Sequence, residues 1–188
     1  LMHGRVFEKV GVNISTVWGA FSPEFRSKIP GSGETGQFWA SGVSFVAHPF
    51  SPHVPAAHFN TRFIVTEKAW FGGGGDLTPV FADNKDTADF HAAFQAACDA
   101  TDKSYYADFK QQCDDYFYLK HRGEARGVGG IFYDYLDSGD RAADFAFTKA
   151  VGTAFTQIYP ELVRRHYNKP WDADARQAQL KKRGRYVE

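Results

Sequence analysis

Gly42-Val-Ser-Phe-Val-Ala-His48 and His58-Phe-Asn-Thr-Arg-Phe63 are the stretches that decide the fold, and Pro49-Phe-Ser-Pro-His-Val-Pro55 joins them. Both stretches alternate polar and apolar residues with a period of two, which is typical of β-strands. The proline-rich connection stiffens the link between them. We expect the two strands to lie side by side and antiparallel.

Alternation places polar side chains on one face of each strand. Ser44 and His48 share a face of the first strand, and His58, Asn60 and Arg62 share a face of the second. Arginine offers a planar fork for a carboxylate, and histidine can move protons near pH 7. An ordinary solvated sheet face is the alternative. The density of catalytic residue types favours a functional site.

Most of the predicted strands lie in the first part of the chain, and the predicted helices lie in the second part. This order predicts one domain over residues 1–188, of α+β class, with a large, mainly antiparallel sheet flanked by helices. The expected strands are 10–17, 43–48, 58–65, 77–81 and 130–136, with a loop at 22–37. The expected helices are 86–100, 103–121, 140–159 and 172–182. Residues 185–188 read as the start of a further strand, so we expect the fold to be incomplete at both ends.

Composition limits the classes of partner. The formal net charge is zero, which argues against nucleic acid or an anionic membrane as the main partner. No apolar run is long enough to span a bilayer. Two cysteines, Cys98 and Cys113, have no metal or redox spacing and suggest a cytoplasmic protein. The aromatic content of 16% suits either a thick core or a flat hydrophobic ligand.

A second stretch that could form part of a functional site is Trp70-Phe-Gly-Gly-Gly-Gly-Asp76. Glycines let a backbone approach a ligand closely. A phosphate cradle is a weak interpretation, because no Gly-Lys-Ser/Thr follows. Asp76 could accept hydrogen bonds from N–H donors in an aromatic pocket, and a hairpin turn is the competing interpretation.

Lys120, His121, Arg122 and Arg126 form a basic, glycine-rich segment after the second helix. The segment suits an anionic ligand, but basic residues at a helix C-terminus explain it equally well, and we favour that interpretation.

Several blocks then resemble the family of oxygen-dependent coproporphyrinogen III oxidases. They run in order through nearly the whole chain: Gly11-Val-Asn-Ile-Ser15, Gly42-Val-Ser44, His48-Pro49, Val54-Pro55, His58-x-Asn60-x-Arg62, Trp70-Phe-Gly-Gly-Gly, Asp76-Leu-Thr-Pro79, Tyr116-Phe-Tyr-Leu-Lys-His-Arg122, Arg126-Gly-Val-Gly-Gly130 and Arg183-Gly-Arg-Tyr-Val-Glu188.

The resemblance implies oxidative decarboxylation of two propionates of coproporphyrinogen III to vinyl groups, giving protoporphyrinogen IX in haem biosynthesis. Molecular oxygen is then a co-substrate and no organic cofactor is required. It also implies a cytoplasmic homodimer with further chain before Leu1 and after Glu188. Little activity and weak association are expected of these 188 residues alone.

Roles for individual residues follow from the same resemblance. His58 is the implied proton donor, and Asp76 the acidic residue tied to the pyrrole nitrogens. Ser44 and Asn60-Thr61-Arg62 contact the substrate. As candidate ligands of a divalent metal such as manganese, the resemblance marks His48, His58, His91 and His121, although their spacings match no tight metal motif.

Two other functions stay open from the residues. One is a metal-dependent hydrolase or oxygenase that uses the histidines. The other is a tetrapyrrole-binding module without catalysis. Neither a dinucleotide-binding fingerprint nor a cluster-binding cysteine set is present in the sequence.

Overall fold

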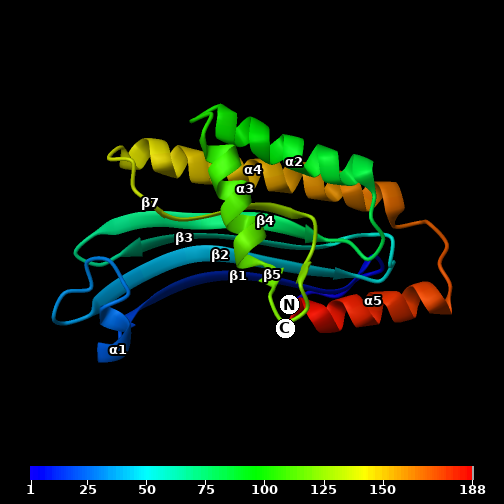
Figure 1. Ribbon diagram of the computed structural model, residues 1–188, viewed down its shortest axis with the longest axis horizontal. Helices are drawn as coiled ribbons and strands as arrows, with labels where there is room; N and C mark the ends of the chain where they lie inside the picture. Colours follow the sequence, from blue (N-terminus) through cyan, green and yellow to red (C-terminus); the bar gives the residue numbers. More distant parts are fainter. Residues whose placement is uncertain (188) are drawn as a thin grey trace.

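The structure is a computed structural model that describes residues 1–187. One antiparallel sheet has the strand order β1-β2-β3-β4-β7, with α2 and α4 along one side and α5 on the other (Figure 1). The strands are β1 (Phe7–Ala20), β2 (Gln37–Pro49), β3 (Ala56–Val65), β4 (Ala69–Thr78) and β7 (Gly129–Leu136). The helices are α1 (Pro23–Arg26), α2 (Asn84–Asp99), α3 (Tyr105–Tyr116), α4 (Arg141–His166) and α5 (Ala173–Tyr186). The predicted α+β class is confirmed.

Aromatic residues fill the layer between the sheet and α2, α3 and α4. Phe59 of β3 stacks on Phe155 of α4 with ring centroids 4.7 Å apart. Phe90, Tyr133 and Phe147 are almost completely buried in the same core. Each buried ring removes a large apolar area from water, so these contacts fix the helices over one face of the sheet.

The glycine run lies inside β4, so the interpretation of it as a turn is wrong. The predicted strand 77–81 instead begins at Ala69 and ends at Thr78, and every residue of β4 is buried. Close neighbours explain the glycines: a Cβ on Gly74 would lie 2.1 Å from the carbonyl oxygen of Ile131. Gly74 also has a φ of 142°, which favours glycine.

Two predicted helices have different ends in the structure. The helix predicted to reach residue 121 ends at Tyr116, and the chain then forms a small hairpin of β5 (Tyr118–Leu119) and β6 (Glu124–Ala125). Conversely, α4 continues through Pro160 to His166. The missing N–H of Pro160 removes one backbone bond, but Leu162 beyond it is fully buried, so tertiary packing continues the helix.

The predicted final strand is wrong. Residues up to Tyr186 belong to α5, and Glu188 lies outside the described residues. Contacts with the sheet hold this helix. Gln179 donates to the Pro49 carbonyl oxygen at 2.9 Å, and Arg176 and Arg183 both pair with Glu8, near the start of β1. No helix within residues 1–187 is both long and apolar enough to cross a bilayer.

Candidate active site on the open sheet face

The side of the sheet opposite α4 carries the polar face that the sequence predicts. Ser44 of β2 lies opposite Asn60 of β3, and His58 lies opposite Asp76 of β4. Directly opposed side chains point to the same face of a sheet. Ser44, His58, Asn60 and Arg62 line a hollow of about 360 Å³. That volume falls in the range of small-molecule sites, about 300–1,000 Å³.

A continuous row of hydrogen bonds crosses this face, and we call it the polar ladder: Arg126, Asp76, His58, Asn60, Arg62 and Asp134. At one end, Arg126 Nη2 lies 2.7 Å from Asp76 Oδ2. The other carboxylate oxygen, Oδ1, lies 3.1 Å from His58 Nδ1. Both oxygens of Asp76 are therefore occupied by partners within the ladder.

The ladder continues along β3 and ends on β7. Asn60 places its Nδ2 3.2 Å from His58 Nε2, and its Oδ1 accepts from Arg62 Nη1 at 3.0 Å. Arg62 Nη2 then pairs with Asp134 Oδ2 at 2.8 Å. At each end of the ladder an arginine pairs with an aspartate, Arg126 with Asp76 and Arg62 with Asp134.

The neighbours of His58 assign its tautomer. Because Asp76 only accepts, the proton lies on Nδ1, and Nε2 accepts from the Asn60 amide. Nε2 is thus the ring atom that can take up or release a proton. A carboxylate on the opposite nitrogen orients the ring and stabilises the imidazolium when it forms.

Burial is greatest at the Asp76 end. Asp76 is only 2% exposed, and it is balanced by Arg126, whose guanidinium lies 3.7 Å from the Phe117 ring centroid and 4.4 Å from that of Tyr186. A planar guanidinium packs well between aromatic rings. The buried carboxylate therefore has a partner of opposite charge in a largely apolar environment.

Aromatic rings flank the rest of the ladder. Phe117 contacts the His58 ring with centroids 6.0 Å apart. Phe132 of β7 lies beneath Arg62, whose guanidinium is 5.6 Å from its ring centroid, and Tyr116 stacks on Phe132. The open face therefore combines charged groups with flat apolar surfaces, which suits a flat ligand that carries carboxylates.

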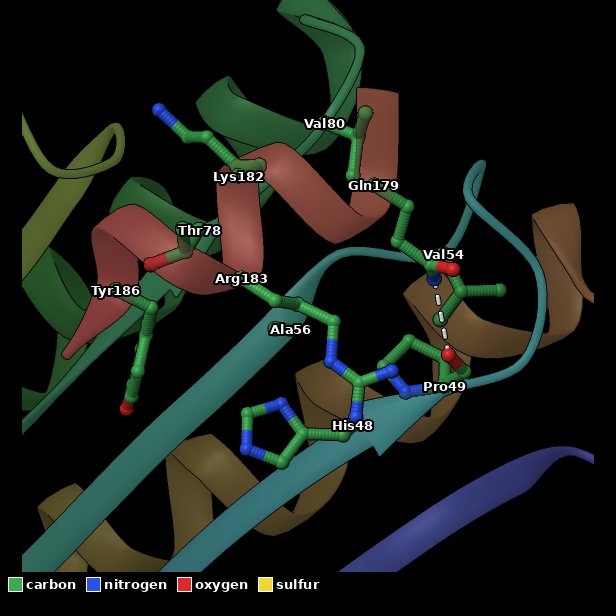
Figure 2. A pocket seen from close by; sticks show the side chains of 10 residues that line it. All are labelled: His48, Pro49, Val54, Ala56, Thr78, Val80, Gln179, Lys182, Arg183 and Tyr186. Carbon is green, nitrogen blue, oxygen red and sulfur yellow. Dashed lines mark hydrogen bonds between the residues drawn. The ribbon is translucent and has the colours of Figure 1, made fainter. Parts of the chain in front are cut away.

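Thr61 and His48, both predicted site residues, lie away from the ladder. Thr61 lies opposite Val43, and its side chain points toward the α4 side of the sheet, so only its main chain faces the hollow. His48 shares the open face but sits under α5 beside Arg183 and Tyr186 (Figure 2). Burial, together with the charges of Arg183 and Lys9, lowers the pKa of His48.

The four histidines marked as metal ligands do not converge. His91 of α2 lies on the α4 side, where its ring nitrogens contact the Val128 carbonyl oxygen and the Tyr106 hydroxyl, both at 2.9 Å. His121 lies in the exposed turn between β5 and β6. Both nitrogens of His58 are held within the ladder. These residues do not fit a shared metal ion, and no step is assigned to one.

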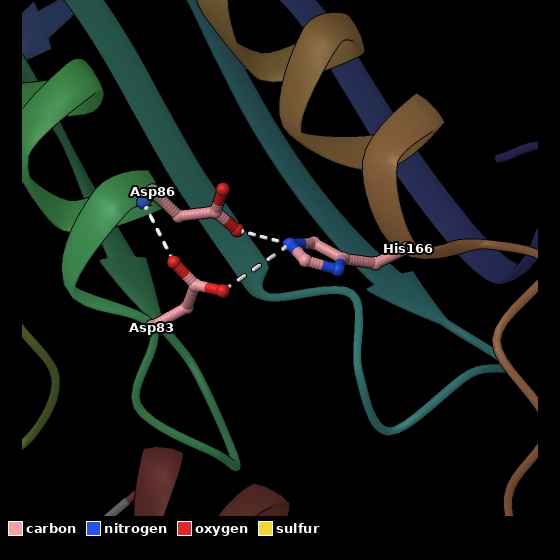
Figure 3. Close-up of side chains that lie close together, drawn as sticks. All are labelled: Asp83, Asp86 and His166. Atoms are coloured by element: carbon pink, nitrogen blue, oxygen red, sulfur yellow. Dashed lines mark hydrogen bonds and ion pairs between the residues drawn. The ribbon is translucent and has the colours of Figure 1, made fainter.

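Among residues 1–187, one other group has metal-ligand chemistry: Asp83, Asp86 and His166 (Figure 3). His166 Nε2 lies 2.5 Å from Asp86 Oδ2, and Arg165 Nη1 lies 2.9 Å from Asp86 Oδ1. Asp83 caps α2 through the amides of residues 85 and 86. The group joins the start of α2 to the end of α4, where its charges also complement the helix dipoles, so its contacts are those of a structural clamp.

Arg126 and Asp134 were not predicted as site residues. Arg126 was singled out in sequence but assigned to a helix end, and only the turn after α3 shows that it reaches Asp76. Asp134 lies within the mostly apolar predicted strand 130–136, and no motif around it indicates a functional role. A long-range pairing of β4 with β7 brings it to Arg62.

Taken together, the sheet and the ladder define an α+β protein whose open sheet face carries a row of hydrogen-bonded polar and charged side chains. The family model for coproporphyrinogen III oxidase matches residues 1–188. The chain is 62% identical over 188 residues to the oxygen-dependent coproporphyrinogen-III oxidases of Rickettsia akari and Rickettsia conorii, and 60% identical to that of Rickettsia bellii. Each match covers 100% of this chain and 67% of the relative. The chain belongs to the coproporphyrinogen III oxidase family.

Proposed function

We propose that this protein catalyses the oxygen-dependent oxidative decarboxylation of two propionates of coproporphyrinogen III to vinyl groups, giving protoporphyrinogen IX in haem biosynthesis. The observation that carries the proposal is His58, held between Asp76 and Asn60 beside Arg62, in a chain of this family. The relatives named as oxygen-dependent coproporphyrinogen-III oxidases support the same activity.

The overall chemistry needs an electron acceptor. Each propionate side chain loses its carboxylate as carbon dioxide, together with one proton from the adjacent carbon chain and two electrons. One molecule of oxygen takes the four electrons from two such side chains and, with protons, becomes two molecules of water. Oxygen is therefore the co-substrate, and the proposal includes no organic cofactor.

Arg62 binds a propionate carboxylate of the substrate in this proposal. Its two terminal nitrogens each use one hydrogen on Asn60 and Asp134, and each keeps a second hydrogen for a propionate. Ser44, opposite Asn60, adds a hydroxyl at the same level of the hollow. The main chain of Thr61 lines that hollow as well. These groups orient the macrocycle over the ladder.

His58 is the proton donor in this proposal. Its Nε2, the ring nitrogen not held by Asp76, takes up a proton beforehand and donates it during the reaction, while Asp76 stabilises the charged ring through Nδ1. Asp76 was expected to contact the pyrrole nitrogens, but its carboxylate is held by Arg126 and His58. A role through His58 agrees better with this geometry, so Asp76 is a positioning residue here.

Assembly and location belong to the proposal as well. The protein acts in the cytoplasm as a homodimer. Both cysteines are free thiols in the core, and burial raises the pKa of Cys98 to about 12, which suits a compartment where thiols stay reduced.

The experiment is to supply coproporphyrinogen III to the full-length protein, with and without oxygen, and to measure carbon dioxide and protoporphyrinogen IX. We expect both products in a fixed ratio only when oxygen is present. His58→Gln, which keeps a polar side chain without a proton-transferring ring, should bind the substrate and release little carbon dioxide. Binding without carbon dioxide from the unaltered protein would refute the proposal and indicate a tetrapyrrole-binding module.

A further inference from the structure

We propose that Asp134 is a positioning residue that holds the Arg62 guanidinium in place for a substrate carboxylate. The inference rests on the proposed function, because it concerns the substrate propionates. Asp134 Oδ2 lies 2.8 Å from Arg62 Nη2, and both side chains remain about a quarter exposed. Arg62 lines the hollow, where a ligand can reach it, and Asp134 lies beside it on β7.

A β-bulge directs Asp134 toward Arg62. The pairing of β4 with β7 shifts register between Phe71 and Gly73, which adds a residue on the β7 side. Within this bulge, Tyr135 has a φ of 57°, and it is the one non-glycine residue with positive φ among those described. Its N–H donates to Asp134 Oδ1 at 3.0 Å. Bulges near active sites often redirect a side chain, and left-handed backbone at a tyrosine is unfavourable.

Gly72 provides the space for the pair. A Cβ at this position would lie 2.7 Å from Asp134 Oδ1 and 2.8 Å from Arg62 Nε. Its nearest atoms all belong to these two side chains. Glycine at 72 is therefore explained by the pair itself, which makes the pair a built feature of the open face.

Positioning matters because arginine is long and flexible. Asn60 holds one terminal nitrogen of Arg62 and Asp134 holds the other, so the plane of the guanidinium is fixed from two sides. The free hydrogens then point in one direction as a fork for a carboxylate. An ion pair with this exposure contributes little to folding stability. If the Arg62–Asp134 pair had only a structural role, removing Asp134 would therefore leave ligand binding unchanged.

The test compares coproporphyrin III with its tetramethyl ester by equilibrium binding, since both porphyrins are stable to oxygen. We expect Asp134→Asn to reduce the preference for the acid over the ester by about tenfold or more. Asp137→Asn, the same charge change at an exposed site nearby, should leave the preference unchanged. In an Arg62→Ala background, Asp134→Asn should have no further effect, because the two residues act as one unit.

Gly72→Ala gives an independent variant. The three atoms nearest to the added methyl group belong to the Arg62 and Asp134 side chains, so it should displace the pair, leave the sheet folded, and reduce the same preference. An unchanged preference in Asp134→Asn, or an equal loss for acid and ester, would overturn the role of Asp134. An unaltered protein with no preference for the acid would overturn it too.

Carbon dioxide release by the unaltered protein separates the two proposals. If that protein decarboxylates coproporphyrinogen III while Asp134→Asn keeps its preference for the acid, only the inference about Asp134 fails. If it binds the acid but releases no carbon dioxide, only the proposed function fails.

Discussion

Among the residues of the polar ladder, Asp76 is held by burial and by partners on both of its carboxylate oxygens. Its carboxylate is buried, and it joins His58 to Arg126. We predict that Asp76→Asn, which keeps the shape but removes the charge, lowers the rate of carbon dioxide release by ~10²–10³, since a preorganised charge beside the proton donor is lost. The rate is measured in single turnovers with saturating substrate.

The same change leaves Arg126 as an unpaired buried charge, which commonly costs about 3–5 kcal/mol of folding stability. Activity is therefore compared at a temperature where circular dichroism shows the variant folded. Asp99→Asn, at an exposed site of α2, serves as the matched control. A folded Asp76→Asn protein with near-normal turnover would remove Asp76 from the mechanism.

Arg62 allows a second prediction at the same scale. Lysine keeps the charge but cannot bridge Asn60 and Asp134 with a planar fork, so Arg62→Lys should not behave as a conservative change. We expect weaker binding of coproporphyrin III and unchanged binding of its tetramethyl ester, both followed by fluorescence titration. If the variant prefers the acid as strongly as the unaltered protein does, Arg62 binds something other than a propionate.

At the scale of elements, α5 depends on Glu8. Burial opposes ionisation of Glu8, but the hydrogen bonds and charges of Arg183 and Arg176 outweigh it and lower the pKa of the carboxyl below its ordinary value of 4.5. A pKa lowered in the folded state stabilises the protein above the unfolded-state value, and this contribution is lost as pH falls through the folded-state value.

We therefore predict that Glu8→Gln speeds amide hydrogen exchange in α5 at neutral pH, and that its difference from the unaltered protein fades below pH 4.5. Exchange is read per peptide by mass spectrometry, with the exposed Glu24→Gln as control. Equal exchange in both proteins at neutral pH would show that Gln179 and the apolar contacts alone hold the helix.

The elements also show how far the sequence could predict the fold and the site. Period-two alternation identified β2 and β3 and placed Ser44, His58, Asn60 and Arg62 on one face, because alternation is a local property. The helix at 172–182 was predicted, but the ends of α4 and α5 depended on distant partners, such as the core around Leu162 and the carboxylate of Glu8. The position of Asp134 beside Arg62 depends on a β-bulge, and no local sequence pattern predicts that bulge.

At the scale of the whole molecule, the aromatic residues divide between two layers. Most of the largest buried rings, such as Phe90 and Phe147, fill the core beneath α2 and α4. A smaller group, Phe117, Phe132 and Tyr186, surrounds the polar ladder on the opposite side. The two interpretations of the aromatic content, a thick core and a flat ligand, are therefore compatible, since each concerns a different face of the sheet.

The sheet also separates His91 from His48 and His58, three of the four histidines that the resemblance marks as metal ligands, and this separation leads to a prediction for the whole protein. His58 lies on the open face, whereas His91 lies on the α4 side and uses both ring nitrogens on Val128 and Tyr106. One ion cannot bind histidines on both sides of a sheet, because its ligands must lie about 2 Å from it. We predict that carbon dioxide release survives treatment with a chelator, and that His91→Gln lowers thermal stability without changing the metal content measured by mass spectrometry. Adding back manganese or magnesium to the chelated protein is the control. Complete loss of activity on chelation, restored by one equivalent of an ion, would mean that the histidines rearrange around a metal and would favour a metal-dependent oxygenase.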